Sequence, residues 1–223
     1  MEKTRILCFG DSLTWGFDPV TRTRLPEEVR WPGVLQKLLG PGCKVIEEAQ
    51  SGRTIATEDP AEGEKNGLRY VIPCIESQSP LDLMIVMLGG NDLKRKFSFA
   101  TIDIAGEMQI FLEKVQGYNR FRMEDRMKVL LIAPPPVGEE AEDPWLEDLF
   151  DFERARKVSG ELAGWYSQLA EMYGCYYLDA AQIVKASAVD GVHLDPDSHE
   201  KLARAVYKKL VEEGQILCSD KII

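Results

Sequence analysis

The sequence contains little of what metal centres and disulfide frameworks require. Only two of its 223 residues are histidines, His193 and His199, which argues against a metal site built from several histidine ligands. The five cysteines are an odd number and include no Cys-x-x-Cys pair, so neither a disulfide framework nor a zinc site is expected. We interpret them as reduced thiols and expect a cytoplasmic protein that needs no metal and no cofactor.

Long hydrophobic runs and an excess of positive charge are absent too. No apolar run approaches the ~20 residues that a membrane-spanning helix needs, so none is expected. Residues 1–5 lead directly into a strand-like run, unlike a signal peptide. The net charge of −10 argues against a nucleic acid or an anionic membrane as the partner. We therefore expect the ligand to be an uncharged or cationic small molecule.

Two widespread glycine motifs are missing as well. The chain has no Gly-x-Gly-x-x-Gly or Walker-type stretch that would hold the phosphates of a nucleotide. Around Ser12 the flanking positions are Gly10 and Thr14, so the Gly-x-Ser-x-Gly elbow of α/β-hydrolases is absent. These absences weaken the hypothesis of a nucleotide-binding module, and a serine nucleophile must lie in another kind of turn.

The sequence does contain short apolar runs that alternate with amphipathic segments. This alternation predicts βαβ units, and hence an α/β fold with a parallel sheet covered on both faces. No linker interrupts it, so we expect a single domain over residues 1–223. The apolar runs predict strands at 6–9, 45–46, 83–88, 129–133 and 176–178. The helical spacings predict helices at 31–39, 67–78, 101–115, 146–152, 155–173 and 199–210.

Three segments have a more specific interpretation. The run at 83–88 is the most apolar in the chain and predicts the centre of the sheet. Residues 120–128 are charged and are interpreted as a crossover between a helix and a strand. Residues 17–30 are polar and contain prolines, which predicts a long loop. Loops of this length in a compact domain are typical of active-site lids or subunit contacts.

Polar residues and glycines follow the predicted strands. Ser12 comes after the first strand, Gly52 after the second and Asn91 after the third, while Asp190 and His193 share one short segment near the C-terminus. Because parallel strands end at one edge of a sheet, we expect these residues to converge. Ser12 would be a nucleophile, His193 its base and Asp190 the group that orients the base. The backbone N–H groups of Ser12 and Gly52 and the Asn91 amide would stabilise an oxyanion.

Each of these residues also has a purely structural interpretation. Ser12 and Asp11 are typical N-caps of a helix. Gly52 and Asn91 are typical turn residues, and Asp190-Gly191 is typical of a type I′ turn. Their joint occurrence favours the catalytic interpretation, because four independent turns would otherwise have to resemble catalytic parts by accident.

Four further residues near these turns are candidates for other roles. Trp15 is a candidate wall of an acyl pocket, although a tryptophan beside a sheet often serves packing alone. Asp11 is a candidate substrate contact, but we expect its main role to be accepting hydrogen bonds in the turn, because His193 is the better base at neutral pH. We interpret Asp92 as structural, and His199 as a surface or capping residue at the start of a helix.

The candidate residues lie in four short blocks of sequence. In chain order the blocks are Gly10-Asp11-Ser12-Leu13, Gly52, Gly89-Gly90-Asn91-Asp92 and Asp190-Gly191-Val192-His193. This succession resembles the SGNH (GDSL-type) hydrolase superfamily. The resemblance implies a flavodoxin-like three-layer α/β/α sandwich with a five-stranded parallel sheet, the SGNH hydrolase fold. It also implies Ser12, Asp190 and His193 as the catalytic triad and Ser12, Gly52 and Asn91 as the oxyanion hole.

A narrower resemblance covers further stretches. Residues 5–16, Val45-Ile46-Glu47-Glu48, Arg53-Thr54 and Leu81-Asp82-Leu83 are similar to the arylesterase/acyltransferase subgroup typified by a mycobacterial acyltransferase. This similarity implies hydrolysis of small esters, acyl transfer to alcohols or hydrogen peroxide, and an oligomer with confined active sites. Residues 17–30 and 97–152 depart from the pattern, and these segments would shape the mouth of the pocket and the subunit contacts.

The sequence therefore predicts a serine esterase that acts on small, short-acyl aryl or alkyl carboxylic esters through an acyl-enzyme on Ser12. A carbohydrate O-acetyl esterase with the same triad is the second hypothesis. A flavodoxin-like module, in which Ser12 and Gly52 hold an anion or a nucleotide at helix N-termini, is the alternative without catalysis. We also predict a homo-oligomer, from the loop at 17–30 and the family resemblance.

Overall fold

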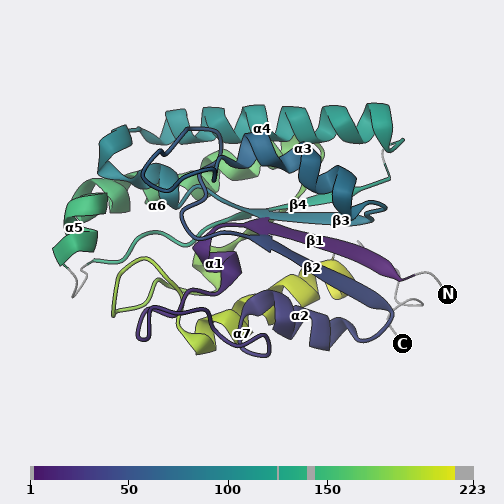
Figure 1. Cartoon of the computed structure of the whole chain (residues 1–223), viewed down its shortest axis with the longest axis horizontal. Coiled ribbons are helices and arrows are strands. Elements are labelled where there is room, and N and C mark those ends of the chain that lie inside the picture. Colours follow the sequence, from purple (N-terminus) through teal and green to yellow (C-terminus); the bar gives the residue numbers. More distant parts are fainter. Residues whose placement is uncertain (1–2, 125, 140–143, 214–223) are drawn as a thin grey trace.

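Five parallel strands form the central sheet of the computed structural model, which describes residues 3–124, 126–139 and 144–213 and only the backbone of 212 and 213. The strand order is β2-β1-β3-β4-β5, so β3 is central, as predicted. Helices cover both faces of the sheet (Figure 1), which confirms the expected three-layer α/β/α fold. The strands are β1 (Thr4–Gly10), β2 (Cys43–Ala49), β3 (Leu83–Met87), β4 (Lys128–Ala133) and β5 (Tyr176–Asp179).

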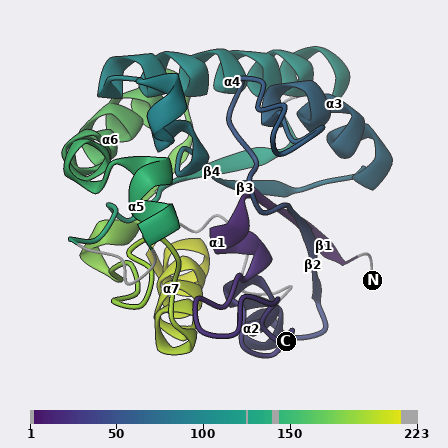
Figure 2. The same ribbon diagram turned by 60° about the vertical axis from the view of Figure 1, so that its left-hand side comes forward.

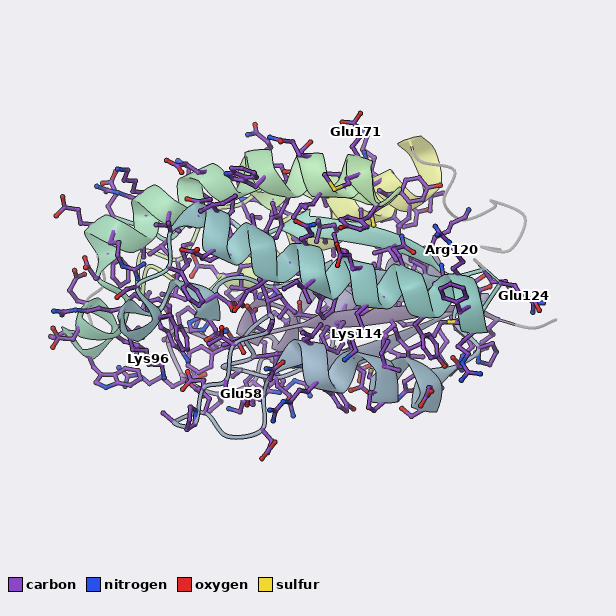
Figure 3. The ribbon with its side chains drawn as sticks, turned by 90° about the horizontal axis from the view of Figure 1, so that it is seen from above. Glu58, Lys96, Lys114, Arg120, Glu124 and Glu171 are labelled. Atoms are coloured by element: carbon purple, nitrogen blue, oxygen red, sulfur yellow. The ribbon has the colours of Figure 1, made fainter. Side chains whose placement is uncertain are left out.

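The helices form two layers, seen clearly in Figures 1 and 2. One layer consists of α2 (Trp31–Leu39) and α7 (Pro196–Lys208). The other consists of α3 (Gly67–Gln78), α4 (Thr101–Arg122) and α6 (Phe152–Met172). Seen from above, α4 lies between α3 and α6, and its Lys114 donates a hydrogen bond of 2.7 Å to the carbonyl of Leu68 on α3 (Figure 3).

The central strands are apolar throughout because both faces of the sheet are buried. In β1, Leu7 and Phe9 pack into the core beneath α3, α4 and α6, whereas Ile6 and Cys8 pack into the core beneath α2 and α7. Side chains of a strand alternate between the two faces, so a strand covered on both sides needs apolar residues at every position. This explains why uninterrupted apolar runs marked the strands.

Several boundaries differ from the predicted ones. The strand predicted at 45–46 is the seven-residue β2, whose exposed Lys44 interrupts the apolar run, as an edge strand allows. The helix predicted at 101–115 continues to Arg122, so the interpretation of 120–128 as a crossover is wrong over its first turn. Cations at the last turn of a helix face its negative dipole end, so Arg120 and Arg122 favour the helix rather than ending it.

The interpretation of His199 as a surface or capping residue is wrong. The closing helix begins at Pro196 rather than at 199, with the proline in its first turn. This start turns His199 inward, on the same face as Leu202 and Val206. Its imidazole is fully buried, its Nδ1 accepts a hydrogen bond of 3.3 Å from the backbone N–H of Trp31, and burial lowers its pKa to about 4.

The loop at 17–30 is confirmed and has a defined structure. Phe17 and Arg24 form an antiparallel bridge across it. The guanidinium groups of Arg24 and Arg30 lie 2.8 and 2.5 Å from one carboxylate oxygen of Glu47 on β2. These ion pairs hold residues 24 and 30 of the loop against the edge strand β2.

The described part of the chain bears on the expectations about membrane-spanning helices and disulfides. No helix there is long and apolar enough to cross a membrane. Cys8, Cys74 and Cys175 carry free thiols, and Cys218 lies outside the described residues. Two short helices, α1 (Ser12–Trp15) and α5 (Pro144–Phe150), lie at the edge of the sheet where its strands end (Figure 2).

Candidate active site

Ser12 lies in a tight turn directly after β1. Asp11 caps α1, because its Oδ1 accepts a hydrogen bond of 3.0 Å from the N–H of Leu13. A Cβ at Gly10 would lie 2.2 Å from Oγ1 of Thr14, so only glycine allows the chain to turn this closely. Burial raises the pKa of the Asp11 carboxyl to about 6. Asp11 therefore holds the turn, although it also borders the cavity described below.

His193 and Asp190 complete a chain of hydrogen bonds that starts at Ser12. Nε2 of His193 lies 3.0 Å from Oγ of Ser12, and Nδ1 lies 2.6 Å from Oδ2 of Asp190. The other oxygen of Asp190 accepts from the N–H groups of Val192 and His193 at 3.0 and 2.9 Å. Burial opposes ionisation of Asp190, but its bonds to His193 outweigh burial and lower its pKa. An ionised Asp190 on Nδ1 leaves Nε2 free to accept the proton of Ser12.

The ring of Phe17 packs against His193. The two ring centroids are 4.2 Å apart, with 34° between the planes. Phe17 is the first residue after the cap of α1, so the turn that carries Ser12 also places this ring. Sequence reasoning did not identify Phe17, since an aromatic residue in a loop carries no signal of its own.

The predicted oxyanion donors lie at the same edge of the sheet. Gly10 at the end of β1 is paired in register with Ala49 on β2 and Met87 on β3, so the turns after these three strands begin at one level. Gly52 has a φ of +87°, and a Cβ there would lie 2.3 Å from Oε2 of Glu62, which explains the glycine. Nδ2 of Asn91 donates at 3.1 Å to the carbonyl of Arg53, which uses one of its two hydrogens.

Ser12, Gly52, Asn91 and His193 all line one cavity of about 600 Å³. Its remaining walls are largely apolar and come from three places. These are the loop at 17–30 with Phe17, Pro19 and Val20, the segment after β4 with Pro134, Pro135 and Val137, and α5 with Trp145, Leu146 and Leu149. The cavity thus has one polar end, where the candidate catalytic groups meet, and an apolar remainder.

The structure does not bring Trp15 to this cavity. Trp15 lies three residues beyond Ser12 on α1, and its ring packs against the guanidinium of Arg24, 5.2 Å from the ring centroid. Arg24 also donates to the carbonyl of Trp15 at 2.9 Å. Trp15 was a candidate for the wall of the cavity, with packing as the alternative. Phe17 lines the cavity instead, because one helical turn followed by the αL residue Gly16 redirects the chain.

Sequence reasoning missed a cluster of one buried amine and two carboxylates that borders the cavity. The side chain of Lys94 is 2% exposed, and its amine lies 2.9 Å from Asp59 and 2.7 Å from Glu62. Burial opposes ionisation of Glu62, but the hydrogen bond from Lys94 outweighs burial and lowers the pKa of that carboxyl. The available signal was the position of Lys94, three residues after Asn91, but a lone lysine in a turn is usually exposed.

Asp92 lies behind the site, in agreement with its structural interpretation. Its carboxylate accepts from the N–H of Ile55 at 3.0 Å and is fully buried. Burial and the neighbouring Glu107 raise the pKa of Asp92 well above its usual range. Asp92 thereby ties the turn after β3 to the segment that follows Gly52.

The three-layer fold with serine, histidine and aspartate hydrogen-bonded in series at its carboxyl edge is an arrangement typical of hydrolases built on an open parallel sheet. Residues 8–201 match the GDSL-like lipase/acylhydrolase family. The chain belongs to this family, and the enzyme class expected from the sequence, a carboxylic ester hydrolase, is confirmed.

Three similar proteins illustrate the relationship. A carbohydrate acetylesterase from Sinorhizobium meliloti is 36% identical, with a TM-score of 0.87 over 93% of this chain and 98% of that one. An aryl esterase from M. smegmatis is 37% identical, with a TM-score of 0.86 over the same shares. An arylesterase from Vibrio mimicus is 30% identical over 142 residues, which are 62% of this chain and 60% of that protein. The predicted SGNH arylesterase subgroup is thereby confirmed.

Proposed function

We propose that the protein hydrolyses small, short-acyl aryl or alkyl esters with Ser12 as the nucleophile. The observation that carries this proposal is the hydrogen-bonded chain from Ser12 through His193 to Asp190, which opens into the cavity. As Oγ of Ser12 attacks the ester carbonyl, Nε2 of His193 takes its proton, and ionised Asp190 stabilises the imidazolium. The sequence assigned these three roles, and the geometry supports them.

The negative charge that forms on the carbonyl oxygen needs donors. We propose the backbone N–H groups of Ser12 and Gly52 and the remaining hydrogen of the Asn91 amide. The tetrahedral intermediate then expels the alcohol, which receives the proton from His193, and leaves an acyl-enzyme on Ser12. Water then attacks the acyl carbon while His193 takes its proton. The second tetrahedral intermediate collapses, which releases the acid, and Ser12 receives the proton back from His193.

Labelling with a fluorophosphonate tests the assignment of Ser12. The phosphorus is attacked by an activated serine and stays bound to it, so we expect one adduct, on the peptide that contains Ser12. Heat-denatured protein and the His193→Ala variant serve as controls and should remain unlabelled. Ester hydrolysis without any adduct on Ser12 would contradict the proposal, as would equal labelling of the denatured chain. A module that only binds an anion predicts no covalent adduct.

A second candidate substrate is an O-acetylated carbohydrate. It is favoured by the Glu62 carboxylate at the polar end of the cavity and by the similarity to the S. meliloti carbohydrate acetylesterase. A carboxylate can accept hydrogen bonds from sugar hydroxyls, which an aryl acetate lacks. Glu62→Gln should therefore lower kcat/KM for an acetylated sugar and leave that for an aryl acetate nearly unchanged. Equal effects on both substrates would argue against this candidate.

Acyl transfer is a further proposal, supported by the apolar walls of the cavity. Apolar walls disfavour water, so an alcohol or hydrogen peroxide that enters the cavity competes better for the acyl-enzyme. Turnover of one aryl acetate with methanol, hydrogen peroxide or water alone as acceptor should show a methyl ester or peracid as a product. Acid as the only product at high acceptor concentration would contradict this proposal.

Assembly as a homo-oligomer and residence in the cytoplasm remain predictions. Val20 and Trp145 are 70% and 64% exposed and both lie at the cavity, and this common position of two exposed apolar side chains supports a contact with a second copy. The free thiols support a reducing compartment. Light scattering that gives a strict monomer would contradict the first prediction.

A further inference from the structure

Arg53, the residue after Gly52, has a fully buried guanidinium that connects two strand ends. Its Nη1 donates to the carbonyl of Gly10 at 3.0 Å and to that of Glu48 at 2.5 Å, and its Nη2 donates to Oε1 of Gln50 at 3.1 Å. Gly10 ends β1, directly before the turn with Ser12, and Glu48 lies near the end of β2. One side chain thus joins the strand that leads to the nucleophile to the strand that leads to Gly52.

Two aromatic rings face this guanidinium. Its central carbon lies 4.2 Å from the ring centroid of Phe9 and 5.4 Å from that of Tyr70. The faces of these rings attract the cation, and the negative charges of Glu48 and Asp11 favour it as well, although burial lowers the pKa of the guanidinium. Its Nη atoms bond three acceptors, two of them carbonyls at the ends of neighbouring strands, while its Nε has no hydrogen-bond partner in the described part of the chain. The side chain is thus fixed from several sides, which suits a group that sets the spacing of the two strand ends.

The backbone of Arg53 reaches a third element. Its carbonyl accepts the hydrogen bond of 3.1 Å from Nδ2 of Asn91, in the turn after β3. This bond fixes the plane of the amide, so the second hydrogen of Nδ2 has one direction in which to point. The amide N–H of Gly52 belongs to the Ser51–Gly52 peptide, one residue before Arg53 in the chain. All three proposed oxyanion donors are therefore connected through this one residue.

We propose that Arg53 is a positioning residue of the oxyanion hole, an inference that rests on the proposed function of Ser12, Gly52 and Asn91. The guanidinium sets the distance between the turn with Ser12 and the turn with Gly52, and the carbonyl sets the direction of the Asn91 amide. Oxyanion donors act mainly in the transition state, so misplaced donors lower kcat more than they raise KM.

Two substitutions separate the geometry of the guanidinium from its charge. Arg53→Met keeps most of the length of the side chain but removes the donors and the charge, and Arg53→Lys keeps the charge without the fork of N–H groups. We expect Arg53→Met to lower kcat for an aryl acetate by about 10²-fold, comparable to the loss of one oxyanion donor, with KM changed less than about threefold. Arg53→Lys should lose about tenfold, because one ammonium cannot replace both arms of the fork.

Arg5 offers a matched control. Its guanidinium donates to the backbone carbonyls of Pro80 and Gln78 at 2.7 Å each, at the opposite edge of the sheet. Arg5→Met removes the same kind of bonds, so it should lower the melting temperature without changing kcat. All activities are expressed per site titrated with a fluorophosphonate, so unfolded enzyme does not count as a loss of kcat.

A transition-state analogue provides the second measurement. A trifluoromethyl ketone that adds to Ser12 forms an oxyanion, so its inhibition constant should rise by about the same factor as kcat/KM falls in the Arg53 variants. Normal kcat per titrated site in both variants would overturn the proposal, as would an equal loss in Arg5→Met. Where Arg53→Met does not fold, Arg53→Lys decides alone, and wild-type kcat in it overturns the proposal. Absence of activity that depends on Ser12 in the wild-type enzyme would instead overturn the proposed function.

Discussion

Ser12 and His193 are separated by 181 positions in the chain, yet Oγ of the first lies 3.0 Å from Nε2 of the second. Ser12 follows the strand β1, and His193 lies in the loop before α7. The two helices that flank these residues on the same face of the sheet, α2 and α7, pack against each other. The contact between the proposed nucleophile and its base therefore depends on the packing of α2 against α7.

Replacement of Ser12 by alanine removes the proposed nucleophile. Ser12→Ala should lower kcat on a chromogenic acetate ester by about 10⁴- to 10⁶-fold, the range expected for a member of a triad. Far-UV circular dichroism should show that the variant folds like the wild type, since only one Oγ is lost. Wild-type turnover by a correctly folded variant would contradict the assignment of Ser12 as the nucleophile.

Asn91 is expected to contribute one oxyanion donor. Asn91→Ala should lower kcat by about 10²- to 10³-fold with a smaller change in KM, because the amide bonds the oxyanion and not the ground-state ester. Asn119→Ala is the matched control: this buried amide bonds the backbone of Met127 at 2.8 and 3.1 Å, at the other edge of the sheet. The control should lose stability and keep kcat. A similar loss of kcat in both variants would contradict the role of Asn91.

The buried imidazole of His199 makes stability depend on pH. Its pKa is about 4 in the folded protein and 6.5 in a model peptide, so the unfolded chain binds the proton more tightly. The contribution of neutral His199 is complete above pH 6.5 and is lost as the pH falls from 6.5 towards 4. The loss amounts to about 3 kcal/mol at most, at ~1.4 kcal/mol for each pH unit.

His199→Asn tests this dependence, since its Oδ1 can accept the N–H of Trp31 but does not titrate in this range. The raised pKa of Asp11 acts in the opposite direction in both proteins, so the two profiles are compared with each other. Urea unfolding at intervals between pH 4 and pH 8 should show the wild type losing stability relative to the variant as the pH falls from 6.5 towards 4. Parallel profiles for wild type and variant would show that His199 is not the group responsible. Esterase activity at neutral pH should be retained, because His199 does not line the cavity.

Removal of the buried amine of Lys94 should destabilise the protein. Lys94→Met removes the common partner of Asp59 and Glu62, although Asp59 keeps its ion pair with Lys96 and the part-buried Glu62 keeps that with Lys65. A buried charge left without any partner costs about 3–5 kcal/mol, so we expect a smaller loss of about 1–3 kcal/mol here. Chemical denaturation should show a loss in this range, and the double variant Lys94→Met with Asp59→Asn should recover part of it. A single variant as stable as the wild type would refute this account of the cluster.

The elements that could be predicted from sequence are those whose residues repeat a local pattern. The helix at 67–78 was predicted with its observed bounds, because Asn66 caps it and its buried residues recur at helical spacing. The end of α4 was missed, because Asn119 is buried through its bonds to Met127, a contact that a periodicity analysis does not contain. His199 was misjudged for the same kind of reason, since its partner is the backbone of Trp31.

The candidate site shows the same division. Ser12, Gly52, Asn91, Asp190 and His193 lie in short motifs with glycine or a capping residue, so their positions could be predicted, and the structure brings them to one edge of the sheet. Phe17 rather than Trp15 lines the cavity because of the direction that the chain takes after Gly16, and no sequence motif indicates this direction.

The sequence by itself determined the order of strands and helices and the turns that carry the polar residues, because backbone conformation and the alternation of buried positions depend on neighbours along the chain. Only the tertiary structure decided that the loop before α7 brings His193 within hydrogen-bond distance of Ser12, that Lys94 is buried and that the Arg53 guanidinium joins two strand ends. These contacts join residues distant in the chain, and their geometry is set by how the layers pack against the sheet.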